Sequence, residues 1–343
     1  MVSAVSTEPA PHLSFIVPFY ASHDKLGACV RSLTTHCSLP FEIIIIDDGN
    51  VGYDYGDTEG MDTVCIVKNA ENRGPSYCRN QGIKAARGTY LQFIDSDDTL
   101  IGDPADYFSA AEKSGTDLPD VITGLLEGGR LFPRLAKNLP RTTNLTQDLA
   151  LVKLGIFTAH IYNRRFLLDN HIEFPTDLRG AEDTVFLMRV WACASRVVLT
   201  ELAYYRYRRV ENSLTNTGTP DHKPLSPDSG LEHRFRVAAG YILDALDGHS
   251  DAQAVRGSII LKYGIKSLIR LVGLGEEKDF ENLLSILAAL IRRADILSAA
   301  AERTRETAGV YWDNRLQQIA VNIQQENGTA IRDVLAGEDV RLF

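Results

Sequence analysis

Three carboxylates follow a short apolar segment of this chain. Residues 90–94 are apolar or aromatic apart from Gln92, a pattern typical of a buried strand, and Asp95, Asp97 and Asp98 come directly after them. Hard divalent cations such as Mg²⁺ and Mn²⁺ prefer carboxylate oxygens and take their remaining ligands from water and substrate phosphates. A solvated turn or a helix cap has a similar composition. The stretch therefore indicates either a metal-bound phosphate or an ordinary acidic turn.

A second acidic pair follows a second apolar segment. Residues 41–46 are rich in β-branched side chains, as in a strand buried on both faces, and Asp47 and Asp48 come next. Ligands of open α/β sheets bind beyond the carboxyl ends of the strands, so we expect both acidic groups to line one crevice. One carboxylate can accept hydrogen bonds from a nucleobase or a ribose while another holds a metal on a diphosphate. Arg79, one turn into a helix after Gly74, suits a phosphate or a base carbonyl.

Strands alternate with helices in the first hundred residues, which predicts an α/β fold with a mostly parallel, doubly wound sheet flanked by helices. Pro18 is expected to end the first strand, because proline does not continue a ladder in a central strand. The expected strands are residues 13–17, 41–46, 64–67 and 90–94. Later segments are predicted as helices at 106–113, 148–155 and 182–195, with a helical turn within 161–170, and as extended chain at 121–126, 130–135, 197–200 and 203–208.

The domain limits follow from composition. Residues 216–230 are dense in Pro, Gly, Ser and Asp, as in a linker, and no proline occurs beyond them. Apolar residues recur at helical spacing in that last part. We therefore predict an α/β domain at 1–217, a linker at 218–230 and an all-helical domain of about five helices at 231–343. Self-association as a homo-oligomer is the preferred role of the helical domain, with binding of an acceptor or another partner as the alternative.

Composition excludes several classes of function. The 343 residues are 44% hydrophobic and 24% charged, as in ordinary soluble proteins, and the net charge of −9 argues against nucleic-acid binding by the whole molecule. The five scattered cysteines form no C-x-x-C pair, which disfavours a disulfide framework or a zinc site. No apolar run is long enough to span a bilayer. We expect a cytoplasmic protein, with peripheral contact at the inner face of the cell membrane as a further option.

In order and spacing, a set of short motifs resembles the inverting nucleotide-sugar glycosyltransferases of the GT-A fold, family 2. The motifs are Pro18-Phe19-Tyr20, Asp47-Asp48-Gly49, Asn72-Arg73-Gly74 followed by Arg79-Asn80, Asp95-Ser96-Asp97, and Glu182-Asp183. The resemblance covers about residues 13–215. It implies a Rossmann-like GT-A domain that moves a sugar from a nucleotide-diphosphate sugar, with UDP as the expected nucleotide. The implied acceptor is a hydroxyl of a glycan or a lipid-linked oligosaccharide in cell-surface polysaccharide synthesis, and the implied cofactor is Mn²⁺ or Mg²⁺.

The resemblance also implies roles for individual residues. Tyr20 and Asp48 would hold the base, Arg79 would lie near the base or diphosphate, Asp95 would lie near the ribose, and Asp97 would bind the metal. The full set placed at the donor is Pro18, Tyr20, Asp48, Arg79, Asp95, Ser96, Arg206 and Ser213. Arg206 and Ser213 belong to a late basic segment, residues 205–215, that can clamp the diphosphate. Arginines alternating with tyrosines there also fit a solvated surface strand.

The catalytic base is expected in Glu182-Asp183. Acids in a first helical turn are common for capping and dipole reasons alone, but an inverting transferase needs a carboxylate to deprotonate its acceptor. By the resemblance, Asp183 is the base and Glu182 its support. At His160 related sequences often carry lysine, so a structural histidine is the preferred interpretation.

Two rival functions stay open. A nucleotidyltransferase would carry a Gly-rich basic phosphate loop after the first strand, which the sequence from Val17 to Ala21 lacks. An inactive UDP-binding scaffold subunit would keep nucleotide binding without turnover.

Overall fold

In the computed structural model, strands and helices alternate along the first hundred residues, as predicted. The structure describes residues 11–22, 24–131, 133, 135–178, 181–208, 231–245, 257, 259–261, 264–265, 268, 277–294 and 314–335. The chain divides into two compact units. The first unit comprises Met1–Asn144, Gly155–Thr176 and Cys193–Glu211, and the second comprises Leu145–Leu154, Asp177–Ala192 and Asn212–Phe343. This division interleaves segments that the sequence assigns to one domain, and the predicted linker at 218–230 lies outside the described residues.

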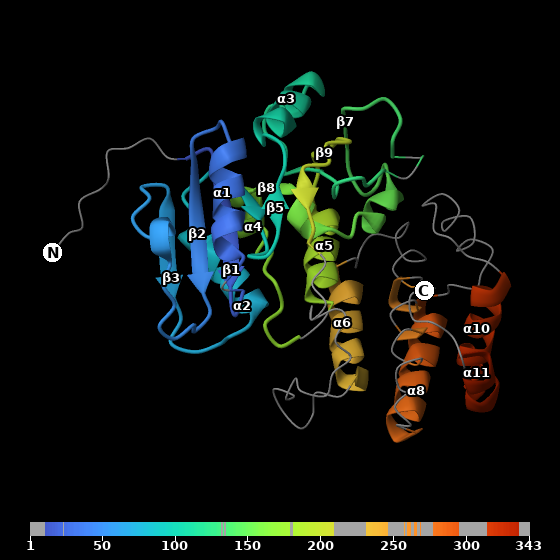
Figure 1. Ribbon diagram of the computed structural model, residues 1–343. Coiled ribbons are helices and arrows are strands. Elements are labelled where there is room, and N and C mark those ends of the chain that lie inside the picture. The colour runs from blue at the N-terminus through green and yellow to red at the C-terminus, as the bar shows by residue number, and fades with distance from the viewer. Residues whose placement is uncertain are drawn as a thin grey trace. The chain divides into compact units, whose positions relative to one another are not determined.

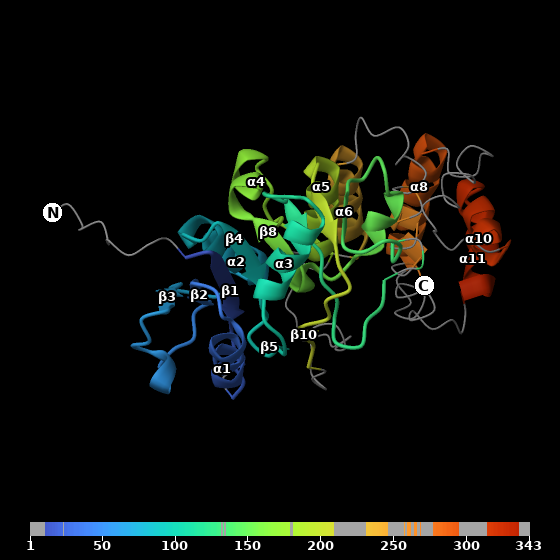
Figure 2. The same cartoon turned by 90° about the horizontal axis from the view of Figure 1, so that it is seen from above.

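Parallel strands form the part of the sheet that carries the predicted acids. They are β1 (Leu13–Phe19), β2 (Phe41–Asp47), β3 (Val64–Lys68) and β4 (Tyr90–Phe93), in the order β3-β2-β1-β4. Helices α1 (Leu26–His36) and α2 (Pro75–Ala85) lie on opposite faces of these strands (Figures 1 and 2). The doubly wound arrangement predicted from the alternation is confirmed.

Successive residues of β1 point to the two helical layers in turn. Phe15 and Val17 share a buried cluster with Leu26 and Val30 of α1. Ile16 points the other way, where a Cβ placed on Gly82 of α2 would come within 2.3 Å of its Cγ2 atom. The absence of a side chain at position 82 therefore lets α2 lie directly on the strand.

The sheet continues beyond β4 with shorter strands that the sequence indicated less well. Within the described residues the full order is β3-β2-β1-β4-β8-β6-β9-β7. The added strands are β8 (Ile161–Asn163), β6 (Val121–Ile122), β9 (Val197–Leu199) and β7 (Arg141–Thr143), and a separate two-stranded sheet pairs β5 (Thr99–Leu100) with β10 (Tyr205–Arg206). The extended segment predicted at 130–135 is wrong, because the described residues there form turns and no strand. The edge strand β7 supplies the pairing instead.

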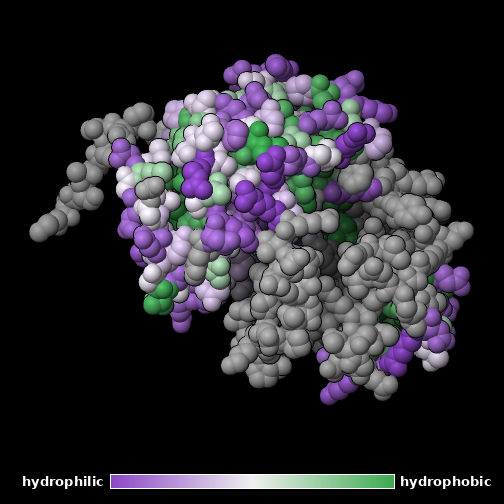
Figure 3. All heavy atoms as spheres, in the orientation of Figure 1, coloured by the Kyte–Doolittle hydropathy of each residue, from purple (hydrophilic) through white to green (hydrophobic). Residues whose placement is uncertain are grey.

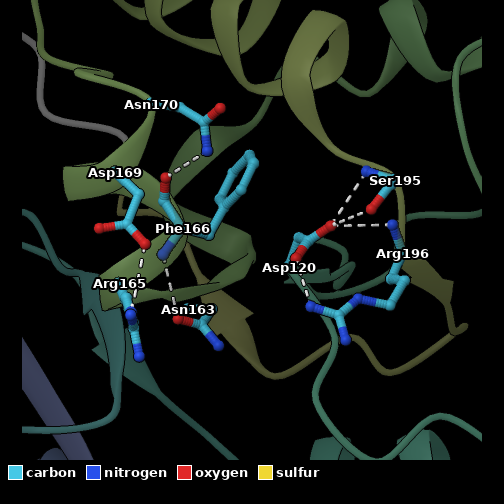
Figure 4. A network of polar contacts seen from close by, with 8 residues as sticks. All are labelled: Asp120, Asn163, Arg165, Phe166, Asp169, Asn170, Ser195 and Arg196. Carbon is cyan, nitrogen blue, oxygen red and sulfur yellow. Dashed lines mark hydrogen bonds and ion pairs between the residues drawn. The ribbon is translucent and has the colours of Figure 1, made fainter.

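Short helices connect these strands. They are η1 (Gly56–Thr58), α3 (Ala105–Lys113), η3 (Phe157–Ala159) and α4 (Arg164–Asp169) in the first unit, and η2 (Leu149–Lys153) in the second. Asn163 caps α4 by accepting a hydrogen bond from the Phe166 amide at 3.2 Å (Figure 4).

A buried carboxylate fixes the start of β9 against the start of β6. Asp120 Oδ2 accepts hydrogen bonds from the Ser195 amide and hydroxyl and from the Arg196 amide at 2.9 to 3.0 Å. Its Oδ1 atom accepts from the Arg196 guanidinium at 3.0 Å (Figure 4). Because a buried charge needs such partners, this cluster holds the strand that leads into β10.

Pro18 does not end β1, contrary to expectation. The pairing with β2 continues through Pro18 and Phe19 to the end of the strand. On the other side, the pairing with β4 stops at Ile16, whose carbonyl accepts from the Ile94 amide at 3.0 Å. Backbone groups alternate sides along a strand, so Pro18 faces the β4 side beyond the last paired residue. Its missing N–H therefore breaks no ladder bond.

The described α-helices of the second unit run from 8 to 18 residues. They are α5 (Glu182–Cys193), α6 (Leu231–Ala245), α8 (Glu277–Ala294), α10 (Asn314–Gln324) and α11 (Gly328–Leu335). Leu283, Leu287, Ile319 and Ile331 are buried. No helix in the described part of the chain has the length and apolar character needed to cross a membrane.

Hydrophilic residues cover much of the described surface, with hydrophobic residues scattered between them (Figure 3). Large hydrophobic side chains exposed among the described residues are Tyr20, Val51, Leu118, Ile156, Leu168 and Tyr207. All six belong to the first unit. Self-association through the helical part stays a prediction.

Glu42 is a buried acid of β2 whose ionised form stabilises the fold. Its Oε1 atom accepts from the Ser14 hydroxyl at 2.7 Å and the Arg87 amide at 2.6 Å, and Oε2 accepts from Arg87 Nε at 2.9 Å. Burial opposes ionisation, but the hydrogen bonds from Ser14 and Arg87 outweigh it and lower the Glu42 pKa. Glu42→Gln turns one acceptor into a donor facing Arg87, and should lower the free energy of unfolding by about 1–3 kcal/mol at pH 7.

The pH dependence follows from the lowered pKa. The stabilisation is fully present above the ordinary glutamate pKa of about 4.3 and is lost as the pH falls through the lower folded-state value. In urea titrations, the difference between wild type and Glu42→Gln should therefore shrink below about pH 4. Asp169→Asn is the control, because its exposed pair with Arg165 contributes little. Equal effects of the two substitutions at pH 7 would contradict the assignment.

Candidate active site

The carboxyl ends of the parallel strands bring the predicted donor residues to one edge of the sheet. The Asp48 amide donates to the Phe19 carbonyl at 2.9 Å, so the residues after β1 and β2 are joined there. Tyr20 follows Phe19, with 55% of its surface exposed. The residues after β4 begin at Ile94, beside β1, and continue into Asp95. Strand ends thus place Tyr20, Asp48 and Asp95 along the same edge, as the sequence predicted.

The Asp48 carboxylate organises the loop between β3 and α2. Its Oδ1 atom accepts from Asn69 Nδ2 at 3.0 Å and from the Arg73 amide at 2.8 Å, and Oδ2 accepts from the Gly74 amide at 2.8 Å. Gly49 has φ of +87°, and a Cβ there would lie 2.7 Å from the Glu71 carbonyl carbon. The motifs at 47–49 and 72–74 are therefore two sides of one packed contact.

Asp47 points away from this loop and is structural, as predicted. Its Oδ1 atom accepts from the Asn50 amide at 2.8 Å and from Asn50 Nδ2 at 2.6 Å. The Tyr55 hydroxyl donates to Oδ2. Asp47 thus shapes the turn after β2, while its neighbour Asp48 faces the β3–α2 loop.

Arg79 of α2 orients Asp95. Its Nη2 atom donates to Asp95 Oδ1 at 2.9 Å, and the guanidinium lies over the rings of Phe157 and Phe174 at 4.6 and 5.3 Å from the centroids. The Arg79 side chain is 7% exposed and the Asp95 side chain 35%. A rigid, buried cation therefore fixes a carboxylate that remains open to solvent.

Asp97 is the half-buried acid of the same turn. Burial, reinforced by the negative charge of Asp95, raises the pKa of its carboxyl group. Burial also raises the pKa of Asp98 to about 7, with Asp95 and Asp97 adding to it against hydrogen bonds that favour the ionised form. No hydrogen bond from another residue in the described ranges reaches the Asp97 carboxylate. Crowded carboxylates of this kind fit a divalent cation at Asp97, which would relieve their repulsion.

The described residues do not hold three or more His, Cys, Asp or Glu side chains in an arrangement that could bind a metal by protein ligands alone. An ion of the Mg²⁺ type usually takes one or two carboxylates and completes its shell with water and substrate phosphates. Ser96, between Asp95 and Asp97, is buried.

Asp98 and Tyr205 join the acidic turn, residues 95–98, to strand β10. The sequence did not indicate this contact. The Tyr205 hydroxyl donates to Asp98 Oδ2 at 2.6 Å, and the Arg208 amide donates to Oδ1 at 2.8 Å. The Asp95 amide donates to the Tyr205 oxygen at 3.2 Å. The only sequence signal was a third acid next to a buried strand, and its partner lies 107 residues later.

The late basic segment is only partly described. Arg206 forms a two-bond ion pair with Glu127, at 2.7 Å for each bond, and both side chains are exposed. The positive charge of Arg208 acts on Asp97, where it opposes the larger effects of burial and Asp95 on the pKa. Arg206 as the diphosphate clamp stays a prediction, and Arg208 is a second candidate. Ser213 lies outside the described residues.

Glu182 and Asp183 open helix α5 in the second unit. Both are partly exposed, and Asp183 Oδ1 accepts from the Thr184 amide at 2.7 Å. Ala181 before them has φ of +64°, which marks a sharp turn into the helix. Because each unit is described by itself, their place relative to Asp97 stays a prediction.

His160 is a buried structural residue, as predicted. It is 1% exposed, and its Nδ1 atom accepts from the Gly124 amide at 3.2 Å. It therefore belongs to the packing of the sheet rather than to a ligand site.

Part of this chain is similar in sequence to known glycosyltransferases. Residues 14–166 match the family described as Glycosyl transferase family 2. A poly(ribitol-phosphate) beta-glucosyltransferase of Bacillus spizizenii is 31% identical over 209 residues, which are 56% of this chain and 32% of that protein. The succinoglycan biosynthesis protein ExoO of Rhizobium meliloti is 27% identical over 269 residues, covering 73% of this chain and 74% of ExoO.

Among solved structures, residues 1–349 of Staphylococcus aureus TarS in complex with UDP-GlcNAc superpose with a TM-score of 0.69 at 22% identity. The match covers 94% of this chain and 90% of the TarS chain. At this identity the match shows a common fold, a GT-A sheet with a helical C-terminal region. This chain spans about a third of the Bacillus spizizenii protein and about three quarters of ExoO. The family match covers residues 14–166, the part of the chain that carries the strand-end acids at 47–48 and 95–98.

Proposed function

We propose that the chain transfers a sugar from a UDP-sugar to a hydroxyl group of a growing cell-surface glycan or of a lipid-linked acceptor. The observation that carries this proposal is the acidic turn at residues 95–98, which is paired with Arg79 and lies at the same carboxyl edge of a parallel sheet as Asp48. This edge is where α/β folds bind nucleotides. Exposed Tyr20 provides a ring face for the base.

The proposed reaction is a single displacement with inversion at the anomeric carbon. Asp183 accepts the proton of the acceptor hydroxyl as its oxygen bonds to the anomeric carbon, and the bond from that carbon to the diphosphate oxygen breaks. Glu182 supports the base. Arg208, together with Arg206 once it leaves Glu127, stabilises the charge that grows on the departing UDP. No covalent enzyme intermediate is needed.

A divalent cation fits the proposal through Asp97. When bound, Mn²⁺ or Mg²⁺ would supply charge neutralisation to the diphosphate. Arg79 pairs with one oxygen of Asp95, and Tyr205 and Arg208 bond both oxygens of Asp98, so Asp97 is the acid of the turn that no other described side chain or amide bonds.

The relatives suggest which donors and acceptors to examine first. Their names record a beta-glucosyltransferase acting on poly(ribitol-phosphate), and a protein of succinoglycan biosynthesis. We therefore propose UDP-glucose and UDP-GlcNAc as the first donors and polyol-phosphate or polysaccharide hydroxyls as the acceptors.

A thermal-shift panel of nucleotides and nucleotide sugars, with and without Mn²⁺, tests the proposal. UDP and one UDP-sugar should raise the melting temperature, and Mn²⁺ should enlarge the shift, because a ligand that binds only the folded state stabilises it. The matching UDP-sugar should then release UDP when an acceptor is added. A shift with GDP or ADP alone would contradict the assignment of the base, and binding without turnover would favour the scaffold alternative.

The two arginines of the late basic segment should differ in their effect on UDP binding. Arg208→Ala is expected to weaken UDP affinity in Mn²⁺ about tenfold, because its charge acts on the acidic turn. Arg206→Ala should change affinity less, since Glu127 already neutralises Arg206. Isothermal titration calorimetry measures both values, and a larger loss with Arg206→Ala would reverse the assignment.

A further inference from the structure

We infer that Tyr205 is a positioning residue that sets the place of Asp97 for the metal-bound diphosphate; this rests on the proposed function. A single side-chain oxygen of Tyr205 contacts both ends of the acidic turn. It accepts from the Asp95 amide at 3.2 Å and donates to Asp98 Oδ2 at 2.6 Å. Asp97 lies between these two points in the chain. Its position therefore depends on a hydroxyl group on another strand.

The contact is buried and built on a paired strand. Tyr205 is 1% exposed and belongs to the hydrophobic cluster that includes residues of β1 and α1. Its backbone pairs with Leu100, and Arg206 pairs with Thr99, so the strand right after the acidic turn is held by the strand that carries Tyr205. Because the ring is fixed by packing, the hydroxyl can act as a rigid support for the turn.

Asp98 links the same turn to the basic segment. Its two carboxylate oxygens accept from the Tyr205 hydroxyl and from the Arg208 amide at 2.8 Å. The turn also closes on itself through the Asp98 amide and the Asp95 carbonyl at 2.9 Å. Asp98 therefore holds the acidic turn and the start of the basic segment in one arrangement. A shift of either one would carry the other with it.

Removing the hydroxyl alone separates positioning from packing. Tyr205→Phe keeps the buried ring but leaves the Asp95 amide and Asp98 Oδ2 without this partner, and a lost hydrogen bond to a charged group is costly. The adjacent Tyr204 offers a matched control. Its hydroxyl donates to Asp106 Oδ2, also at 2.6 Å, away from the acidic turn. Tyr204→Phe thus removes the same kind of bond from the neighbouring residue.

Hydrogen exchange of the ligand-free protein is the first measurement. In Tyr205→Phe, peptides covering residues 94–98 and 206–208 should exchange faster than in wild type, and Tyr204→Phe should leave them unchanged. This readout needs no substrate. Unchanged exchange in Tyr205→Phe would overturn the inference whatever the protein binds.

Calorimetry with UDP, in Mn²⁺ and in EDTA, is the second measurement. Tyr205→Phe should weaken UDP affinity about 10- to 100-fold in Mn²⁺ while changing it little in EDTA, because only the Mn²⁺-dependent part depends on Asp97. A merely structural role would weaken both equally or neither. Tyr204→Phe should match wild type in both buffers.

Asp98→Asn supplies a coupling test. It should weaken binding in Mn²⁺ like Tyr205→Phe, and the loss in the double variant should be smaller than the sum of the two single losses, because both changes act on the Tyr205–Asp98 contact. Additive losses, or faster exchange without a Mn²⁺-specific loss, would overturn the positioning role. If the wild type itself does not bind UDP more tightly with Mn²⁺, the proposed function fails, and with it the link between Tyr205 and the metal-bound diphosphate. The hydrogen-exchange result would still decide whether Tyr205 fixes the acidic turn.

Discussion

Asp97→Ala is expected to abolish the Mn²⁺-dependent part of UDP binding, with a loss of affinity of about 100-fold in Mn²⁺ and little change in EDTA. Among the described residues, Arg79 pairs with one oxygen of Asp95 and Tyr205 with Asp98, whereas the Asp97 carboxylate has no such partner. Sugar transfer should fall with the binding, since the departing diphosphate loses the charge that balances it.

Calorimetry with UDP measures this loss, and Asp106→Ala is the control. Asp106 is an acid of α3 that pairs with Tyr204 away from the strand ends. Asp106→Ala should leave the affinity for UDP unchanged in Mn²⁺ and in EDTA. Retention of wild-type UDP affinity in Mn²⁺ by a folded Asp97→Ala protein would show that another residue binds the metal, or that none is used.

Asp183→Asn should separate binding from chemistry. The substitution keeps the shape of the side chain and an oxygen that can accept from the Thr184 amide, but it removes the proton acceptor. We expect UDP and donor affinity to stay close to wild type and transfer to fall by about 10²–10⁴-fold, the usual range for loss of a general base. Release of UDP from the donor identified by the thermal-shift panel measures the rate.

Two further variants sharpen the test of the base. Asp244→Asn, at an exposed position of α6, should have no effect on transfer. Glu182→Gln should cost less than Asp183→Asn if Glu182 only supports the base. Near-normal turnover by Asp183→Asn would end its assignment as the base, and a larger loss with Glu182→Gln would move the role to that residue.

The parallel half of the sheet could be predicted because its signals are local. Apolar segments that end in acids, such as residues 41–48 and 90–98, mark both the strands and the edge at which they end. The paired motifs at 47–49 and 72–74 were also readable, since glycine and aspartate point to turns. The contact between the two motifs could not be predicted, because it depends on how closely the two turns pack.

The later strands and the support of the acidic turn depend on contacts between distant residues. β7 is a three-residue edge strand whose sequence, Arg141 to Thr143, carries no hydrophobic period. Tyr205 and Asp98 are far apart in the chain, and neither residue type identifies the other. Pro18 was misjudged for a related reason, since its place in a strand depends on where the pairing with β4 stops. Such features follow from tertiary packing and leave little trace in local sequence.

The hold of Asp48 on the β3–α2 loop has a thermodynamic consequence for recognition. Three hydrogen bonds, from Asn69, Arg73 and Gly74, order this loop in the free protein. A base that arrives beside it therefore need not freeze a mobile segment, and the entropy lost on association is smaller than for a loop that folds around its ligand. Under the proposed function, the protein would thus recognise a nucleotide with a preorganised surface.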